Sequence, residues 1–275
     1  MRSRYIIYGL AVMALYACTP KNNEVSEGDA GARISTRLQA YASAPTDFQE
    51  GDRIGVSARE FNVPVCTNQA WQYSNGVFTS ADSILVEAGS ELRLSAYYPY
   101  EAALDEAAPT ITIDTRTDGY TDYLWATDTL MMSGSGMQAD LQFRHVLTRI
   151  ECVFIPSAEY PQDESFSFSI SGVRTKVEKN IVTGAEVLSG EGVIERPTQP
   201  NQLNGIELPA QSAQPVITFA YAGHSYSVSP ATEQQYEAGR SYRYEIAFGP
   251  ESDPTISLMQ VSEQSTNFQL LPSRR

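Results

Sequence analysis

The chain has 275 residues and a formal net charge of −14 at pH 7. Binding to nucleic-acid phosphates needs a positive protein face, so this charge argues against nucleic acid as a partner. The length is sufficient to bury one large hydrophobic core or two cores of ordinary size.

The first seventeen residues are predicted to be a secretory signal peptide. Arg2 and Arg4 precede the apolar stretch Tyr5–Leu15, which is too short to span a bilayer as a stable helix. The following Leu15-Tyr16-Ala17-Cys18 resembles the lipobox of bacterial lipoproteins. An ordinary secretory signal with an incidental cysteine is the alternative interpretation.

The lipobox resemblance implies that the signal is cut before Cys18. The sulfur of Cys18 would then receive a diacylglycerol and its new amino group a further acyl chain such as palmitate, which together anchor a protein stably. Thr19, rather than an aspartate, follows the cysteine and favours the outer membrane. Residues 18–32 are small and polar, and we expect them to form a lipidated, flexible tether.

After the tether, apolar residues alternate with polar ones at the period typical of β-strands. The stretch from Ile34 to Ala40 predicts a first strand, and Tyr242–Phe248 predicts a half-buried one. Asn75-Gly76 is a strong signal for a two-residue hairpin, and Ala222-Gly223 predicts another turn. The fold class expected is therefore all-β.

One strand pattern changes phase. Leu141 and Phe143 are apolar residues at odd-numbered positions and share one face, whereas from Val146 to Phe154 the inward residues stand at even-numbered positions. This shift by one residue predicts a β-bulge or a break near Arg144-His145. The polar segment Pro156–Glu164 contains two prolines and predicts a domain boundary. We therefore expect two tandem β-sandwiches, at residues 33–157 and 158–275.

The patterns also predict which large side chains are buried in each domain. In the first domain we expect these to be Phe143, Ile150 and Phe154, and in the second Phe168, Tyr244 and Phe248.

No motif in the sequence indicates an active site, a metal or another cofactor. His145 and His224 have no partner at metal-ligand spacing, and Cys66 and Cys152 are either unpaired or joined in one disulfide. Carboxylates are plentiful, but none stands in an aromatic, cleft-like motif. The many tyrosines would suit either half-buried strands or a sugar-binding platform. We expect a protein that is not an enzyme.

Several segments, in order, resemble the fimbrillins, the Mfa-like type V pilin lipoproteins of the Bacteroides and Porphyromonas group. The matching segments are Ile34–Arg37, Phe48–Val56, Leu94–Tyr100, Asp122–Ala126, Leu141–Ile150, Ile170–Val173, Thr183-Gly184, Leu208–Gln211 and Ala238–Tyr244. Each motif is weak alone, but their order and spacing behind a lipobox are specific.

The resemblance implies two transthyretin-like domains in a structural subunit of a surface fimbria, as stem, tip or anchor, that supports adhesion. Its partners would be other fimbrial subunits, the outer membrane through the lipid, and ligands on host or bacterial surfaces. In this family a trypsin-like protease removes the first strand, and a strand from the next subunit fills the groove. The alternative function is a surface lipoprotein that binds glycans.

The same resemblance makes three arginines candidates for processing, namely Arg33, Arg37 and Arg53. Arg33 is next to the tether, Arg37 alternates within the first strand pattern, and Arg53 lies beyond the loop that follows it. The candidate donor strand is the C-terminal tail, whose apolar residues are Ile256, Leu258, Val261, Phe268 and Leu270. An ordinary last strand of the second domain is the alternative for this tail.

Overall fold

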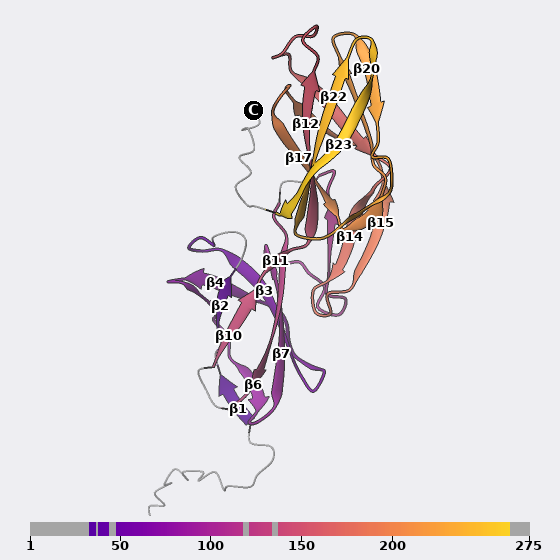
Figure 1. The fold of residues 1–275 in the computed structure, drawn as a ribbon. Helices are drawn as coiled ribbons and strands as arrows, with labels where there is room; N and C mark the ends of the chain where they lie inside the picture. The colour runs from indigo at the N-terminus through magenta and orange to yellow at the C-terminus, as the bar shows by residue number, and fades with distance from the viewer. Residues whose placement is uncertain (1–32, 37, 44–47, 118–120, 134–136, 265–275) are drawn as a thin grey trace, which may run out of the picture.

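The structure is a computed structural model that describes residues 33–36, 38–43, 48–117, 121–133 and 137–264. Within these ranges the chain forms strands and turns but no helix, which confirms the all-β fold class. The strands are arranged in two lobes (Figure 1). The predicted signal peptide, Cys18 and the tether lie outside the described residues.

The N-terminal lobe is built on one sheet of eight strands. In sheet order these are β10 (Gln138–Gln142), β2 (Gln39–Ser43), β5 (Val77–Ser80), β4 (Val63–Ser74), β3 (Arg53–Glu60), β7 (Glu91–Tyr98), β9 (Leu124–Met131) and β11 (Arg144–His145). A separate antiparallel pair consists of β1 (Arg33–Thr36) and β6 (Ile84–Glu87).

The eight-stranded sheet curls back on itself. The backbone N–H of Asp140 in β10 donates to the Asp128 carboxylate of β9 at 2.8 Å, although these strands are not neighbours in the sheet order. The curl encloses a core that includes Trp71, Phe78 and Leu141, each no more than 1% exposed. Alternation along the strands supplies these inward side chains.

The C-terminal lobe is a sandwich of two four-stranded sheets with two smaller sheets beside it. One large sheet is β17 (Leu203–Pro209), β12 (Leu147–Pro156), β22 (Arg240–Gly249) and β23 (Ser252–Glu263). The other is β16 (Ile194–Thr198), β13 (Phe166–Ser171), β19 (Val216–Tyr221) and β20 (His224–Val228). The smaller sheets are β15 (Glu186–Glu191), β14 (Arg174–Asn180) and β8 (Thr110–Asp114), and the pair β18 (Gln211–Ala213) and β21 (Gln234–Tyr236).

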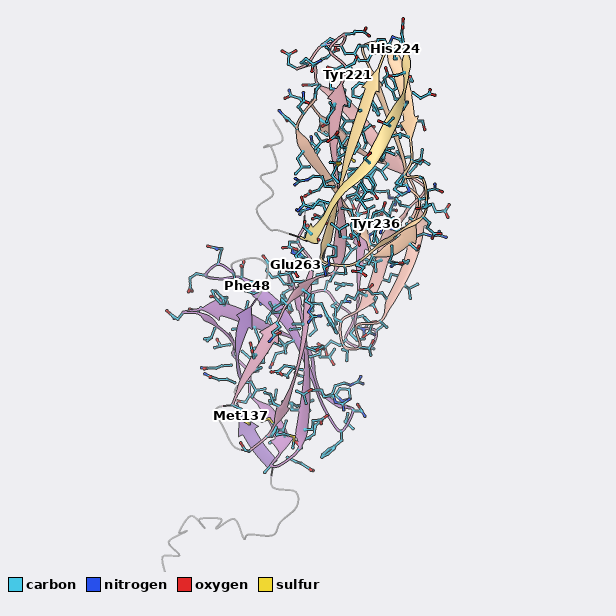
Figure 2. All side chains as sticks on the ribbon, viewed as in Figure 1. Phe48, Met137, Tyr221, His224, Tyr236 and Glu263 are labelled. Carbon is cyan, nitrogen blue, oxygen red and sulfur yellow. The ribbon has the colours of Figure 1, made fainter. Side chains whose placement is uncertain are left out.

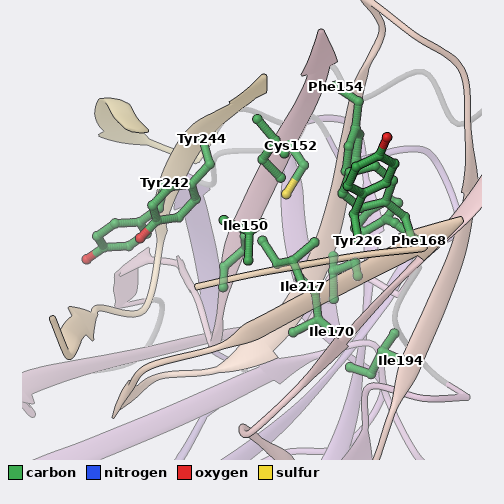
Figure 3. Packing of buried hydrophobic residues seen from close by; sticks show 14 of the residues in the cluster. Ile150, Cys152, Phe154, Phe168, Ile170, Ile194, Ile217, Tyr226, Tyr242 and Tyr244 are labelled. Atoms are coloured by element: carbon green, nitrogen blue, oxygen red, sulfur yellow. The ribbon is translucent and has the colours of Figure 1, made fainter. Parts of the chain in front are cut away.

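Side chains from both large sheets form the core of this lobe (Figure 3). Phe154 of β12 contacts Phe168 of β13, with ring centroids 5.0 Å apart. Buried tyrosines keep their hydroxyls satisfied by pairing, as between Tyr236 and Tyr244 at 2.8 Å. These tyrosines therefore serve the core and form no exposed sugar-binding platform.

The predicted turns are confirmed. Asn75 and Gly76 have φ values of +53° and +86° between β4 and β5, and Ala222 and Gly223 have +48° and +82° between β19 and β20. Positive φ at both central residues matches the right-handed twist of a hairpin. The phase change near Arg144-His145 is confirmed too, because the strand pattern breaks there into β10, β11 and β12.

The expected boundary between residues 157 and 158 is wrong. β12 pairs along its length with β17 and β22, so Ile150 and Phe154 are buried in the C-terminal lobe and not in the first domain. The chain passes from the N-terminal to the C-terminal lobe at the phase change itself, since β10 and β11 belong to the N-terminal sheet and β12 to the C-terminal lobe. β8, from the first half of the sequence, also pairs with β14. The burial of Phe143, Phe168, Tyr244 and Phe248 is confirmed, each no more than 4% exposed.

The lobes meet at Trp125 of β9. Its indole N–H donates to the Ile181 carbonyl at 2.9 Å, and the Lys179 ammonium lies 4.7 Å from the ring centroid. Gly184 approaches so closely that a Cβ there would lie 2.7 Å from the indole. Lys179 also pairs with Glu186 at 2.6 Å, so the charge buried at this joint is compensated.

Candidate strand-exchange site

The first strand predicted from the sequence is two strands with different partners. β1 pairs antiparallel with β6, with Ile34 opposite Val86. β2 lies inside the large sheet, parallel to β10 on one side and antiparallel to β5 on the other. The chain changes partner between Thr36 and Gln39.

Leu38 is the side chain that fixes this change of partner in the core. It is 2% exposed and belongs to the cluster that contains Phe78 and Leu141. Those two residues lie on β5 and β10, the strands that flank β2. Removing β2 together with Leu38 would therefore uncover apolar side chains and free the backbone edges of both flanking strands.

Phe48 forms an aromatic cluster with residues of the strands around β2. Its ring centroid lies 4.9 Å from that of Phe78, the residue opposite Ala40 of β2. It also contacts Phe143 and Tyr98, each at 5.5 Å between ring centroids. Phe48 follows β2 in sequence, so it would stay with the body if β2 were removed.

The three candidate processing residues have different surroundings. Arg33 begins β1, and Arg37 lies outside the described residues, between the end of β1 and the start of β2. Arg53 begins β3, opposite Gln72 of β4, and its carbonyl accepts the Tyr100 N–H at 3.1 Å. A protease requires extended, accessible backbone, which the paired backbone of Arg53 does not offer.

The candidate donor residues Ile256, Leu258 and Val261 lie in β23, the edge strand beside β22 (Figure 1). Ile256 packs against the C-terminal core, whereas Leu258 and Val261 are 42% and 48% exposed. The central part of this strand, residues 255–262, carries no charged side chain. Phe268 and Leu270 lie outside the described residues.

β23 is held at its C-terminal end near the junction of the lobes, where Figure 2 places Glu263. The next residue, Gln264, donates its backbone N–H to the Gly239 carbonyl at 2.8 Å. Its side-chain amide donates to both Glu207 carboxylate oxygens, at 3.2 and 3.0 Å. Arg149 pairs with the same carboxylate at 2.6 Å. Burial raises the pKa of the Glu207 carboxyl, and the Arg149 guanidinium offsets part of this shift.

The two histidines lie far apart and have different contacts. His145 is buried, and its Nδ1 lies 2.6 Å from the Asp122 carboxylate. His224 lies at the outer end of the C-terminal lobe, against Tyr160 and Tyr226 (Figure 2). In the described part of the chain no three His, Cys, Asp or Glu residues are grouped as a metal site.

Cys66 and Cys152 are both free thiols. Burial raises the pKa of Cys66 to about 11 and that of Cys152 further, so both stay protonated at neutral pH. Among the described residues no helix is long and apolar enough to cross a membrane.

Sequence reasoning missed one polar site on the N-terminal lobe, a hollow beside a kink in β4. The kink is at Asn68, whose φ of +53° is unusual within a strand. Asparagine is depleted in strands and tolerates the left-handed conformation, so its presence in this strand pattern was the available signal.

The geometry defines a class first: a two-lobed, all-β protein with a long edge strand whose central residues 255–262 are uncharged, and a short N-terminal strand within another sheet. The chain matches the profile of the fimbrillin-like family over residues 36–262. It belongs to that family, whose members are structural fimbrial proteins.

Solved structures share the fold. A candidate cell adhesion protein of Bacteroides ovatus is 18% identical, with a TM-score of 0.67 over 84% of this chain and 98% of that one. A fimbrial assembly protein of Parabacteroides distasonis is 9% identical, with a TM-score of 0.53 over 85% and 100%. The tip fimbrial protein Mfa3 of Porphyromonas gingivalis is 11% identical, with a TM-score of 0.51 over 85% and 100%. No protein of curated function matches the sequence.

Proposed function

We propose that this chain is a lipid-anchored subunit of a surface fimbria that assembles by donor-strand exchange and supports adhesion. The observation that carries the proposal is the position of β2 between β10 and β5. Loss of a strand from within a sheet frees two backbone edges and an apolar groove, and a strand donated by another subunit would satisfy both. Other fimbrial subunits are therefore the proposed partners.

The strand positions favour Arg37 over the other two processing candidates. A cut after Arg33 would leave all but one residue of β1 attached, whereas a cut after Arg37 would release β1 and free the edge of β6. Beside β6 lies a hollow of about 580 Å³ whose lining includes Phe61, Val63 and Leu85. These side chains are 66%, 64% and 49% exposed and would suit the apolar residues of an incoming strand.

Release of β2 as well would need a cut farther along the chain. Residues 38–52 contain neither lysine nor arginine, and the next arginine is Arg53 in β3. Processing at Arg37 would therefore loosen β2 by removing the strand that precedes it. The incoming strand would then compete with β2 for the place between β10 and β5.

Trypsin treatment of the mature chain tests this proposal. We expect mass spectrometry to find a new N-terminus at Leu38, and electron microscopy to find filaments or oligomers. Arg37→Gln should block both results, and Arg53→Gln, as the matched control, should block neither. A processed wild-type chain that stays monomeric would refute strand exchange, and assembly of unprocessed Arg37→Gln protein would refute this processing site.

The membrane anchor has a separate test. We propose that Cys18 carries the lipid and holds the protein at the outer membrane, because the sequence before it resembles a lipobox. Cys18→Ala should abolish metabolic labelling with palmitate and leave an uncleaved precursor. Normal palmitate labelling of this variant would show that the anchor lies elsewhere or is absent.

A further inference from the structure

A polar hollow of about 750 Å³ opens on the N-terminal lobe beside β4. Its lining includes the strand residues Arg53, Asn68, Gln72 and Thr79, and Tyr100 from the loop after β7. This polar hollow plays no part in the packing of the core or in the proposed strand exchange.

The polar hollow owes its shape to the kink at Asn68. The Asn68 backbone N–H leaves the ladder and donates to the Ser57 hydroxyl at 3.1 Å. The ladder between β3 and β4 shifts register at this point, between Val56 and Ala58. Such irregularities re-aim side chains and are common beside binding sites.

A buried network of hydrogen bonds holds the Asn68 side chain beside the hollow. The Tyr97 hydroxyl bonds the Asn68 side-chain oxygen at 2.8 Å and accepts the Glu101 N–H at 3.0 Å. The Asn68 amide donates to the Glu101 carbonyl at 2.9 Å. Gly55 makes room for this network, since a Cβ there would lie 2.1 Å from the Tyr97 ring. The Asn68 side chain is therefore held in place by hydrogen bonds to two residues that do not line the hollow.

Polar side chains continue from this hollow across the sheet in one row. Strand register places Arg53 opposite Gln72, Gln72 opposite Thr79, Thr79 opposite Gln39, and Gln39 opposite Gln138. Five strands spaced about 4.8 Å apart give this polar row a length of roughly 19 Å. Its shape suits an extended molecule better than a single ion.

The chemistry of the polar row indicates the class of ligand. Amides and hydroxyls both donate and accept hydrogen bonds, and among the described residues the Gln72 and Thr79 side chains make no hydrogen bond. The Tyr100 ring stacks on the Arg53 guanidinium at 4.9 Å, which adds an aromatic surface. Asp82 and Glu106 also line the hollow and oppose an anionic ligand, and Arg53 opposes a cationic one.

We propose that the polar hollow and the polar row bind a neutral glycan chain. Sugar hydroxyls donate and accept as these side chains do, and the C–H face of a sugar ring packs on an aromatic ring such as that of Tyr100. The polar row crosses β2, the strand that strand exchange would displace, so the complete site belongs to the unprocessed monomer and its test needs neither processing nor assembly.

The test is binding of the unprocessed, monomeric full chain to an array of neutral glycans that includes hexose, fucose and N-acetylhexosamine oligosaccharides. The double variant Gln72→Ala with Thr79→Val should weaken binding to the retained glycans about tenfold, because it removes two hydrogen-bonding side chains. The matched control, Gln235→Ala with Thr218→Val, changes exposed residues of the C-terminal lobe and should bind as the wild type does.

Equal thermal stability of the three proteins will show that the variants remain folded. The proposal is overturned if no array glycan is retained, if the double variant binds normally, or if the control loses binding equally. Filament formation is measured separately, so failure of this site and failure of strand exchange give different results.

Discussion

At some positions of the N-terminal lobe, close packing leaves no room for a larger side chain. Gly55 is the clearest case, since an added Cβ would lie 2.1 Å from the Tyr97 ring and 2.7 Å from the Asn68 side chain. Both neighbours are buried and held by hydrogen bonds, so they have no free space to move into.

Gly55→Ala should therefore lower the free energy of unfolding by about 1–3 kcal/mol, the usual cost of overpacking. Chemical denaturation will measure this loss. Gly192→Ala is the control, because the nearest atoms to its added Cβ, at 3.3 Å, belong to the flexible side chain of Arg116. Equal stability of the two variants would contradict the packing described around Tyr97.

Glu207 is a residue whose charge should be visible in the pH dependence of stability. Because burial raises its pKa in the folded state, the folded protein takes up this proton before the unfolded chain does. The contribution of Glu207 to stability therefore rises as pH falls through the folded pKa, and it levels off below the unfolded value of about 4.3.

Glu207→Gln removes this titration and keeps the shape of the side chain. The stability of the wild type relative to Glu207→Gln should increase on acidification from about pH 7 to about pH 4. Denaturation midpoints measured across that range test the sign. If the relative stability falls on acidification, the lowering of the Glu207 pKa by the Arg149 guanidinium is larger than the raising of it by burial.

At the scale of elements, the chain changes strand partners at two places, between β1 and β2 and between β11 and β12, within patterns that resemble single strands. The alternation in the sequence identified strands and their buried faces, because the pattern follows from local geometry. It did not identify partners, because pairing depends on contacts distant in sequence. The phase change at Arg144-His145 predicts an irregularity within one domain, whereas in the structure it marks the passage from one lobe to the other.

The first predicted strand shows the same limit. Ile34 to Ala40 reads as one strand, yet β1 and β2 lie on either side of a change of partner. Leu38 fits the alternation as an apolar position, but the neighbouring sequence does not indicate that its side chain anchors the connection between β1 and β2 in the core. Likewise, no sequence pattern brought Arg53, Gln72 and Thr79 into one row, because register across three strands places them together.

Leu38→Ala tests the importance of that join. The side chain is fully enclosed, so its truncation should cost about 2–5 kcal/mol of stability and hasten trypsin cleavage at Arg37. Leu85→Ala, at a position that is 49% exposed, should change both measurements little. Unchanged cleavage and stability in Leu38→Ala would mean that β2 is held by backbone pairing alone.

At the scale of the whole molecule, β2 near the start and β23 near the end of the described chain are attached differently. β2 is enclosed within a sheet, whereas β23 lies at an edge with most of its side chains exposed. β23 is nevertheless tied down at both of its ends, by the tight connection from β22 and by the Gln264 contacts with Gly239 and Glu207. The donor in assembly would therefore be either β23, after these contacts break, or the residues that follow Gln264.

Two truncations separate these alternatives. A chain that ends at Gln264 keeps β23 and the contacts of Gln264, so it should stay folded while losing Phe268 and Leu270. A chain that ends at Gly249 also loses β23, which frees the β22 edge and uncovers the core beside Ile256, so it should be less stable. Because the segment after Gln264 contains the apolar candidate donor residues Phe268 and Leu270, we expect the truncation at Gln264 to be sufficient to abolish filaments. Filaments of normal length from the chain that ends at Gln264 would instead assign the donor to β23, and filaments from both truncations would place the donor outside the C-terminal region altogether.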